Sequence, residues 1–247
     1  MIIVANWKAY VGEFNTAKKL VRLAKTLAGK TKVKIVLAPS APMVGLLAKG
    51  NRSKVEFSAQ DVSETTGGAM TGEATAQTYA SVGALYSIVG HSERRAQGDT
   101  DDVILAKTQH ALAHGLTPIL CVGEAVRDSE AAYLSVVRGQ INAIFEHLSQ
   151  KERMQMMIAY EPIWAIGKTA AESIASSDLT EMVLYIRKVL GDYLPHKAPA
   201  RIPILYGGSV EPTNIRDLAG ASGVDGFLIG HATVDPVLFA GLVNAVS

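Results

Sequence analysis

The stretch Thr117–Val122 reads TPILCV, an apolar run that leads directly into Gly123 and Glu124. A run without polar alternation is typical of a strand buried on both faces, as in a parallel sheet. Similar runs, rich in Val, Ile, Leu and Ala, occur seven more times. These runs are Ile2–Ala5, Lys34–Ala38, Val55–Ala59, Tyr86–Val89, Met156–Tyr160, Ile202–Tyr206 and Gly226–Ile229.

Helical patterns separate these runs. Apolar residues between Phe14 and Ala28 recur at spacings of one and three, which predicts one amphipathic helix. Residues 182–190 repeat the pattern, and Asp178 with Glu181 three positions on predicts the N-cap of that helix. Two further helices are expected over Val103–Ala113 and from Asp235–Pro236 onward.

Eight strands interleaved with helices predict the α/β class and, within it, a (β/α)8 barrel of eight parallel strands ringed by helices. The 247 residues match the usual length of such a barrel, about 250 residues. No Pro/Gly/Ser-rich linker divides the chain, so we expect residues 1–247 to form a single domain. A doubly wound open sheet is the alternative, but its nucleotide-binding form carries G-x-G-x-x-G after the first strand, and that motif is absent here.

Composition excludes several classes of protein. Hydrophobic residues make up 48% of the chain, which argues against disorder. The formal net charge is only +1, whereas nucleic-acid binders and polybasic membrane proteins are usually far more basic. A single cysteine, Cys121, rules out an internal disulfide and a cysteine-based zinc site. We therefore expect a cytoplasmic protein without a nucleic-acid or membrane partner, whose substrate can still carry a phosphate.

Polar residues and glycines follow the apolar runs at the points where the strands should end. In a closed barrel these positions converge on one face, where barrel enzymes place their chemistry. A general base, a cation and two glycine-rich turns would then share one cleft. The residues concerned are Asn6, Lys8, Gln60, His91, Glu93, Glu124, Glu161, Gly207, Gly208, Ser209 and Gly230.

Each of these residues also has a purely structural interpretation. Glu161 could be a polar residue in a turn, His91 a structural histidine, and Lys8 a lysine whose stem packs on apolar surface. Cys121 is interpreted as a small buried hydrophobe, because no catalytic pattern surrounds it. His110 and His114 have the i, i+4 spacing of a metal pair but lack a third ligand, so we interpret them as a helix end.

Taken together, the strand-end motifs resemble those of the triosephosphate isomerase family along nearly the whole chain. The segments that resemble the family are Asn6–Trp7–Lys8, Ala59–Gln60, Thr71–Gly72–Glu73, residues 90–95 (GHSERR), 118–124 (PILCVGE), 160–167 (YEPIWAIG), 206–210 (YGGSV) and 225–230 (DGFLIG).

The resemblance implies a TIM barrel and an isomerase of dihydroxyacetone phosphate and D-glyceraldehyde 3-phosphate that needs no redox or metal cofactor. It implies that Glu161 is the base and that His91 polarises the carbonyl and shuttles protons between the oxygens. Lys8 would meet the developing negative charge and the phosphate, while Asn6 adds a polar contact. Glu93 would be the carboxylate beside Lys8.

The resemblance also implies a lid, a phosphate site and a homodimer. The lid would comprise Pro162, Ile163, Trp164, Ala165, Ile166, Gly167, Lys168 and Thr169. The backbone N–H groups that bind phosphate would belong to Gly167, Ser209, Gly230 and His231. The loop Thr65–Glu73 would enter a second subunit, with Thr71 near the partner's Asn6 and Lys8.

The chain departs from the family pattern at three places: Ala9–Tyr10 after Lys8, Lys168–Thr169 after Gly167, and His231 after Gly230. Two other functions remain open at this point. One is a Schiff-base lyase of the aldolase type that uses Lys8, which would require an uncharged lysine. The other is a barrel that binds a phosphate ligand without catalysis, although such a protein needs neither Glu161 nor His91.

Overall fold

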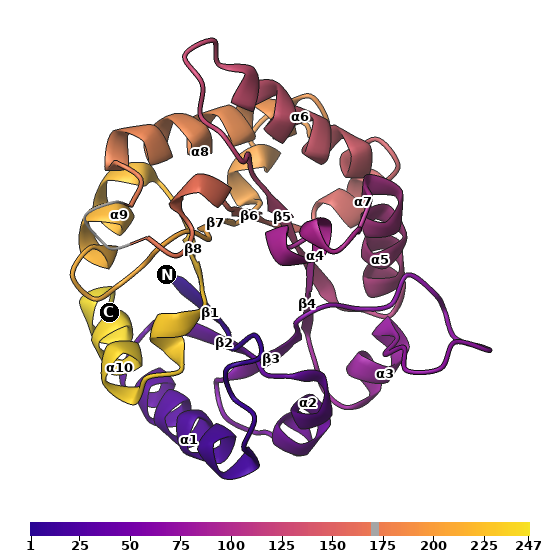
Figure 1. Ribbon diagram of the computed structural model, residues 1–247, viewed down its shortest axis with the longest axis vertical. Coiled ribbons are helices and arrows are strands. Elements are labelled where there is room, and N and C mark those ends of the chain that lie inside the picture. Colours follow the sequence, from indigo (N-terminus) through magenta and orange to yellow (C-terminus); the bar gives the residue numbers. More distant parts are fainter. Residues whose placement is uncertain (169–172) are drawn as a thin grey trace.

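Strand β1 (Ile2–Asn6) pairs in parallel with β2 (Lys34–Ala38) on one side and with β8 (Gly226–Ile229) on the other. The sheet therefore closes into a barrel with the strands in sequence order, which confirms the predicted fold class. The computed structural model describes residues 1–168 and 173–247 (Figure 1). The other strands are β3 (Glu56–Ala59), β4 (Tyr86–Val89), β5 (Thr117–Val122), β6 (Met157–Tyr160) and β7 (Ile204–Tyr206).

The closing seam depends on a glycine at the start of β8. A Cβ atom at Gly226 would overlap the backbone carbonyl of Ile2, with which Gly226 is in register. Only glycine therefore lets β8 approach β1 closely enough to pair.

A ring of helices surrounds the barrel (Figure 1). They are α1 (Phe14–Lys30), α2 (Ala41–Ala48), α3 (Ala76–Ser81), α4 (Ser92–Ala96), α5 (Asp101–Ala113), α6 (Ala132–Phe145), α7 (Gln150–Arg153), α8 (Ser176–Gly191), α9 (Ile215–Ser222) and α10 (Pro236–Ala245). The predicted cap of α10 is confirmed, since Asp235 accepts hydrogen bonds from the N–H groups of Val237 and Leu238. The predicted cap of α8 is wrong: the helix begins at Ser176, so Asp178 lies inside its first turn, where a carboxylate still favours the positive helix end.

Side chains pack in two layers, and this explains why the strands lack polar alternation. Along β1, Val4 belongs to the cluster inside the barrel, whereas Ile3 and Ala5 belong to the layer between strands and helices. Both faces of the strand are buried, so both need apolar residues. Across the described part of the chain, no helix has the length and apolar character that crossing a bilayer requires.

Candidate active site

A cavity of about 410 Å³ opens at the carboxyl ends of the strands. It brings together residues from the first, fourth, sixth, seventh and eighth strand ends, as the barrel predicts. The sequence-predicted residues that line it are Asn6, Lys8, His91, Glu161, Ile166, Gly167, Lys168, Gly207, Gly208, Ser209, Gly230 and His231. Glu93 contacts Lys8 from outside this lining, and the predicted lid residue Thr169 lies outside the described residues.

Glu161 and His91 face each other across the cavity floor. Glu161 Oε1 lies 3.2 Å from His91 Nε2, and both residues are buried. The backbone N–H of Glu93 donates to His91 Nδ1 at 3.2 Å, so this nitrogen carries a lone pair and no proton. This hydrogen bond assigns the ring N–H to Nε2, which points at the carboxylate.

Two local features hold Glu161 in place. Its backbone N–H donates to the carbonyl of Val122 at the end of β5, and its Oε2 accepts from the N–H of Ser92 at 3.1 Å. A Cβ atom at Gly207 would lie 2.8 Å from Glu161 Cγ. Glycine at the end of β7 therefore leaves the space that the carboxylate occupies.

Lys8 adopts a backbone conformation that costs energy. Its φ angle is 45°, in the left-handed region that non-glycine residues rarely enter. Asn6 Oδ1 accepts from the Lys8 N–H, and Gln60 Nε2 donates to the Lys8 carbonyl at 2.9 Å. The Lys8 ammonium lies 2.7 Å from Glu93 Oε1. The sequence placed Gln60 at a strand end without a role, and the structure shows that it holds the strained turn of Lys8.

The predicted lid leaves β6 and lies beside the cavity. Ile163–Ala165 form one turn of 3₁₀ helix, and Ile166, Gly167 and Lys168 line the cavity. The N–H of Lys168 donates to Ser209 Oγ at 3.0 Å, and Ser209 Oγ donates to the carbonyl of Ala165 at 2.9 Å. The Ser209 side chain thus joins the lid to the turn after β7, a contact that the sequence did not predict.

Comparison with known proteins agrees with this geometry. The family model described as "Triosephosphate isomerase" matches residues 1–246. The chain is similar to the triosephosphate isomerase of Alkalilimnicola ehrlichii (39% identity, covering 99% of this chain and 97% of the relative). It is also similar to those of Moorella thermoacetica (37%; 98% and 97%) and Symbiobacterium thermophilum (35%; 100% and 96%).

The chain belongs to the triosephosphate isomerase family. The family match extends from before Asn6 to beyond His231, so it includes every described residue of the cavity lining up to Leu238.

Two of those departures form a pair at the cavity wall. The rings of Tyr10 and His231 lie edge to face, with centroids 5.7 Å apart and an interplanar angle of 82°. Both side chains line the cavity. The sequence marked both positions as unusual for a triosephosphate isomerase but assigned no role to Tyr10. Their contact joins the loop after β1 to the turn after β8, and sequence pattern alone does not indicate contacts between such distant segments.

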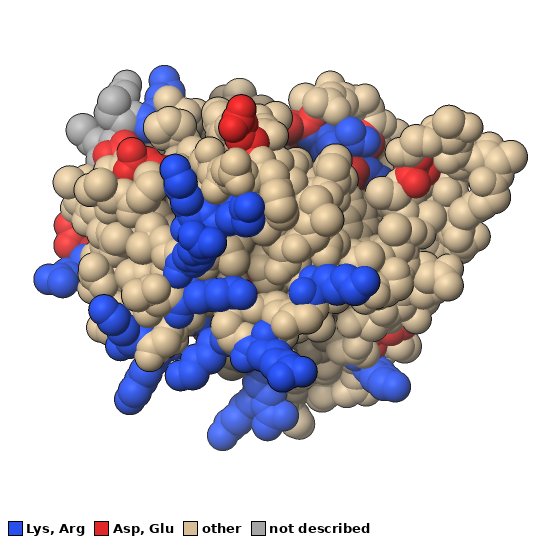
Figure 2. All heavy atoms as spheres, turned by 90° about the horizontal axis from the view of Figure 1, so that it is seen from below, with Lys and Arg blue, Asp and Glu red and all other residues tan. Residues whose placement is uncertain are grey.

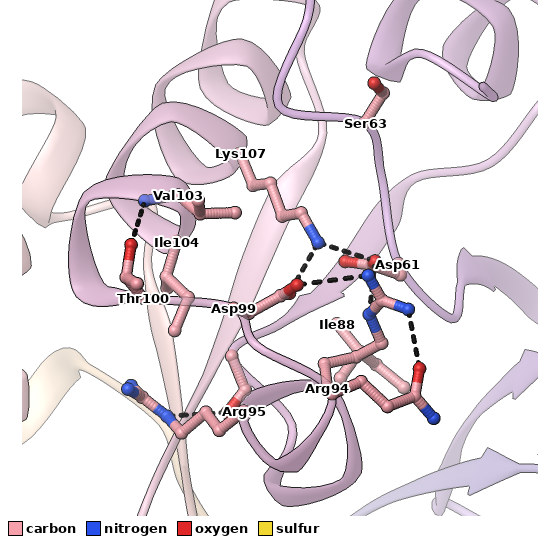
Figure 3. Close-up of polar contacts among 12 residues, drawn as sticks. Asp61, Ser63, Ile88, Arg94, Arg95, Asp99, Thr100, Val103, Ile104 and Lys107 are labelled. Carbon is pink, nitrogen blue, oxygen red and sulfur yellow. Dashed lines mark hydrogen bonds and ion pairs between the residues drawn. The ribbon is translucent and has the colours of Figure 1, made fainter. Parts of the chain in front are cut away.

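A second polar cluster lies at the base of the loop between β3 and α3 (Figure 3). Lys107 is 3% exposed, and its ammonium pairs with Asp61 Oδ2 at 2.7 Å and with Asp99 Oδ2 at 2.5 Å. Arg94 contacts both aspartates. Burial raises the pKa of Asp61, although Lys107 and Arg94 oppose this shift. Nothing in the sequence of this isomerase-family chain indicated a buried lysine in α5.

Cys121 has the structural role that the sequence predicted. It is 1% exposed on β5, and burial, together with the charge of Glu161, raises the pKa of its thiol. His114 directly follows the last residue of α5, as the helix-end interpretation of His110 and His114 requires. Among the residues that the structure describes, no three His, Cys, Asp or Glu side chains are grouped to hold a metal ion.

Proposed function

We propose that this chain interconverts dihydroxyacetone phosphate and D-glyceraldehyde 3-phosphate, a step of glycolysis and gluconeogenesis, with Glu161, His91 and Lys8 as its catalytic residues. Family membership supports the reaction. One observation carries the residue assignment: a buried carboxylate and a buried imidazole face each other, and an ammonium lines the same cavity. Moving a proton next to a carbonyl requires such a base, a hydrogen-bond donor to oxygen and a cation.

The reaction begins when Glu161 accepts a proton from the carbon beside the carbonyl. The electron pair of that C–H bond forms the carbon–carbon double bond of an enediolate, and charge develops on the carbonyl oxygen. His91 Nε2–H donates to this oxygen, and Lys8 stabilises its negative charge. His91 moves a proton between the two oxygens, so the former carbonyl oxygen becomes a hydroxyl and the neighbouring hydroxyl oxygen becomes the new carbonyl. Glu161 returns the first proton to the neighbouring carbon. Asn6 supports the conformation of Lys8 through its side-chain oxygen.

The phosphate group binds at the other side of the cavity. We propose that the backbone N–H groups of Gly167, Ser209, Gly230 and His231 donate to its oxygens. Glycine has no Cβ, so the backbone can approach an anion closely. Lys168 adds a cation beside this position, and its N–H contact with Ser209 supports a lid that covers the phosphate. Covering the enediolate excludes water, which would promote loss of phosphate.

The Schiff-base alternative is not favoured by the environment of Lys8. A lysine that attacks a carbonyl must be uncharged, whereas Lys8 forms an ion pair with Glu93 at 2.7 Å. Glu93 is therefore proposed as a positioning residue that holds the Lys8 side chain in place.

We also propose a homodimer in the cytoplasm. The loop Thr65–Glu73 projects from the barrel wall, and Met70 within it is 46% exposed (Figure 1). A second cavity, lined by Asn6, Lys8, Gln60 and Glu93 among others, opens beside the site and could accept this loop, with Thr71, from a second copy. Sedimentation should give a dimer; a fully active monomer at micromolar concentration would contradict this proposal.

The test of the function is a coupled isomerase assay on Glu161→Gln. Gln has nearly the same shape but accepts no proton, so kcat should fall by about 10²–10⁴-fold with the fold intact. Glu13→Gln, at an exposed residue before α1, is the matched control and should keep the parent rate. If Glu161→Gln stays within a few-fold of the parent rate, Glu161 is not the base.

A further inference from the structure

Positive charge is concentrated in one part of this chain. Residues 14–55 contain ten Lys and Arg and no Asp or Glu. The rest of the chain has 14 Lys and Arg against 23 Asp and Glu. The net charge of +1 is therefore the sum of a strongly positive segment and a negatively charged remainder. The ten cations are Lys18, Lys19, Arg22, Lys25, Lys30, Lys32, Lys34, Lys49, Arg52 and Lys54.

The fold gathers these cations on one face, which we call the basic face. It comprises the outer side of α1, the neighbouring α2 and the segments that follow these helices. Figure 2 shows Lys and Arg side chains spread over this flank with few Asp or Glu among them. Helix α1 connects the carboxyl end of β1 to the start of the parallel strand β2, so the face extends along the barrel wall to the end opposite the cavity.

Few of these charges are neutralised by the protein itself. Among residues 1–168 and 173–247, the only ion pair that any of the ten forms is between Lys34 and Glu56, at 3.0 Å. Lys18 lies over the ring of Phe14, 5.0 Å from its centroid. The other eight are exposed and have no carboxylate within 4.0 Å in the described part of the chain. Such a face produces a positive potential that extends about 10 Å into solution at 0.1 M salt.

The expectation of no membrane partner rests on the net charge alone, and the local charge of the basic face reverses it: we propose that this face binds the surface of an anionic phospholipid bilayer. Eight of the ten cations are lysines. A lysine ammonium is a flexible point charge, whereas the planar guanidinium of arginine forms paired hydrogen bonds with planar groups. Two exposed apolar side chains accompany them: Leu46 on α2, 67% exposed, and Phe14 on α1, 37% exposed. Basic residues mixed with exposed apolar ones are typical of surfaces that bind the interface of a bilayer.

A nucleic acid fits this face less well. Single-stranded nucleic acids bind to aromatic side chains that stack on bases, with Arg contributing more than Lys. The one aromatic ring in residues 14–55 that is exposed is Phe14, and the Lys18 ammonium already lies over it. The bilayer therefore accounts for more of the observed features than an RNA or DNA strand does.

Binding at the basic face would leave the active site open. The cavity lies at the carboxyl ends of the strands, whereas Lys32, Lys34, Arg52 and Lys54 lie just before or at the start of β2 and β3. A protein held on a bilayer by this face would still exchange substrate with solution. The inference is independent of the proposed catalytic roles, so isomerase activity and membrane binding can be measured separately.

The test is co-sedimentation of the full chain with vesicles of phosphatidylcholine alone or with about 30% phosphatidylglycerol. We expect binding to the anionic vesicles only, and weaker binding at higher salt. The triple variant Lys19→Gln/Arg22→Gln/Lys25→Gln should bind about 100-fold more weakly, at about fivefold for each charge removed. The matched control, Lys151→Gln/Lys188→Gln/Lys197→Gln, removes the same charge from exposed residues outside the basic face and should bind like the parent.

Four results would overturn the proposal: no binding to anionic vesicles, equal binding to phosphatidylcholine vesicles, equal losses in both triple variants, or displacement from the vesicles by single-stranded RNA at matched charge. The last result would assign the face to nucleic acid instead. Both triple variants should keep the parent kcat, which shows that they are folded. A parent protein that binds vesicles but lacks isomerase activity would contradict the proposed function and leave this inference standing.

Discussion

Trp164 Nε1 donates a hydrogen bond to Glu124 Oε1 at 2.8 Å and so joins the proposed lid to the end of β5. Tyr160 OH donates to the same oxygen at 2.9 Å. Glu124 is 1% exposed, and burial together with its charge raises the pKa of Tyr160, so the tyrosine remains a donor. The indole of Trp164 therefore reports on the position of the lid relative to the barrel.

Ligand binding should change the fluorescence of Trp164. Gly167 and Lys168, three and four residues along the chain, line the cavity, so a phosphate that contacts them should shift the indole. Trp7→Phe removes the other of the two tryptophans. We expect a saturable change in emission with 2-phosphoglycolate, a non-reactive carboxylate with a phosphate, and none with glycolate. Saturable binding without a change in emission would indicate a lid that does not move.

Lys8 should act through its charge. In Lys8→Met the developing oxyanion and the substrate phosphate both lose a cation, so KM should rise and kcat should fall by about 10²–10³-fold. Steady-state kinetics in both directions measure this effect. Lys151→Met, at an exposed residue of α7, is the control and should change neither constant. Parent values of KM and kcat in Lys8→Met would leave Lys8 with a structural role only.

Lys107 should contribute to stability rather than to turnover. Replacing it by Met leaves Asp61 and Asp99 beside one cation, Arg94, where two carboxylates and two cations were balanced before. Removing one partner from a buried ion pair typically costs about 3–5 kcal/mol. Urea unfolding should show this loss for Lys107→Met and almost none for Lys151→Met. A loss below about 1 kcal/mol would mean that the cluster is better solvated than its burial indicates.

Cys121 should be inert in the folded protein. Burial raises the pKa of its thiol and also blocks access, and the thiolate is the reactive form. Ellman's reagent at about pH 8 should release no thionitrobenzoate from the native protein and one equivalent from the protein unfolded in guanidinium. Rapid stoichiometric reaction of the native protein would show that β5 opens readily.

Much of the architecture follows from local pattern. Four predicted strands, including Thr117–Val122, have the bounds found in the structure, and the other four differ by one or two residues at an end. Element ends are less certain because capping and fraying depend on surroundings. The Asp178 cap shows this: a suitable capping residue was present, but the N-cap position is Ala175, three residues earlier, and the helix begins at Ser176.

The sequence by itself determined the barrel and the residues that surround its cavity. Burial of a strand on both faces requires a continuous apolar run, and the polar and charged residues of the site directly follow these runs. Only the tertiary structure decided the rest. The left-handed turn of Lys8, the pair of Tyr10 and His231, and the buried charge of Lys107 each join segments distant in sequence. Such contacts depend on how strands close and helices pack, and no local periodicity encodes which distant side chains then meet.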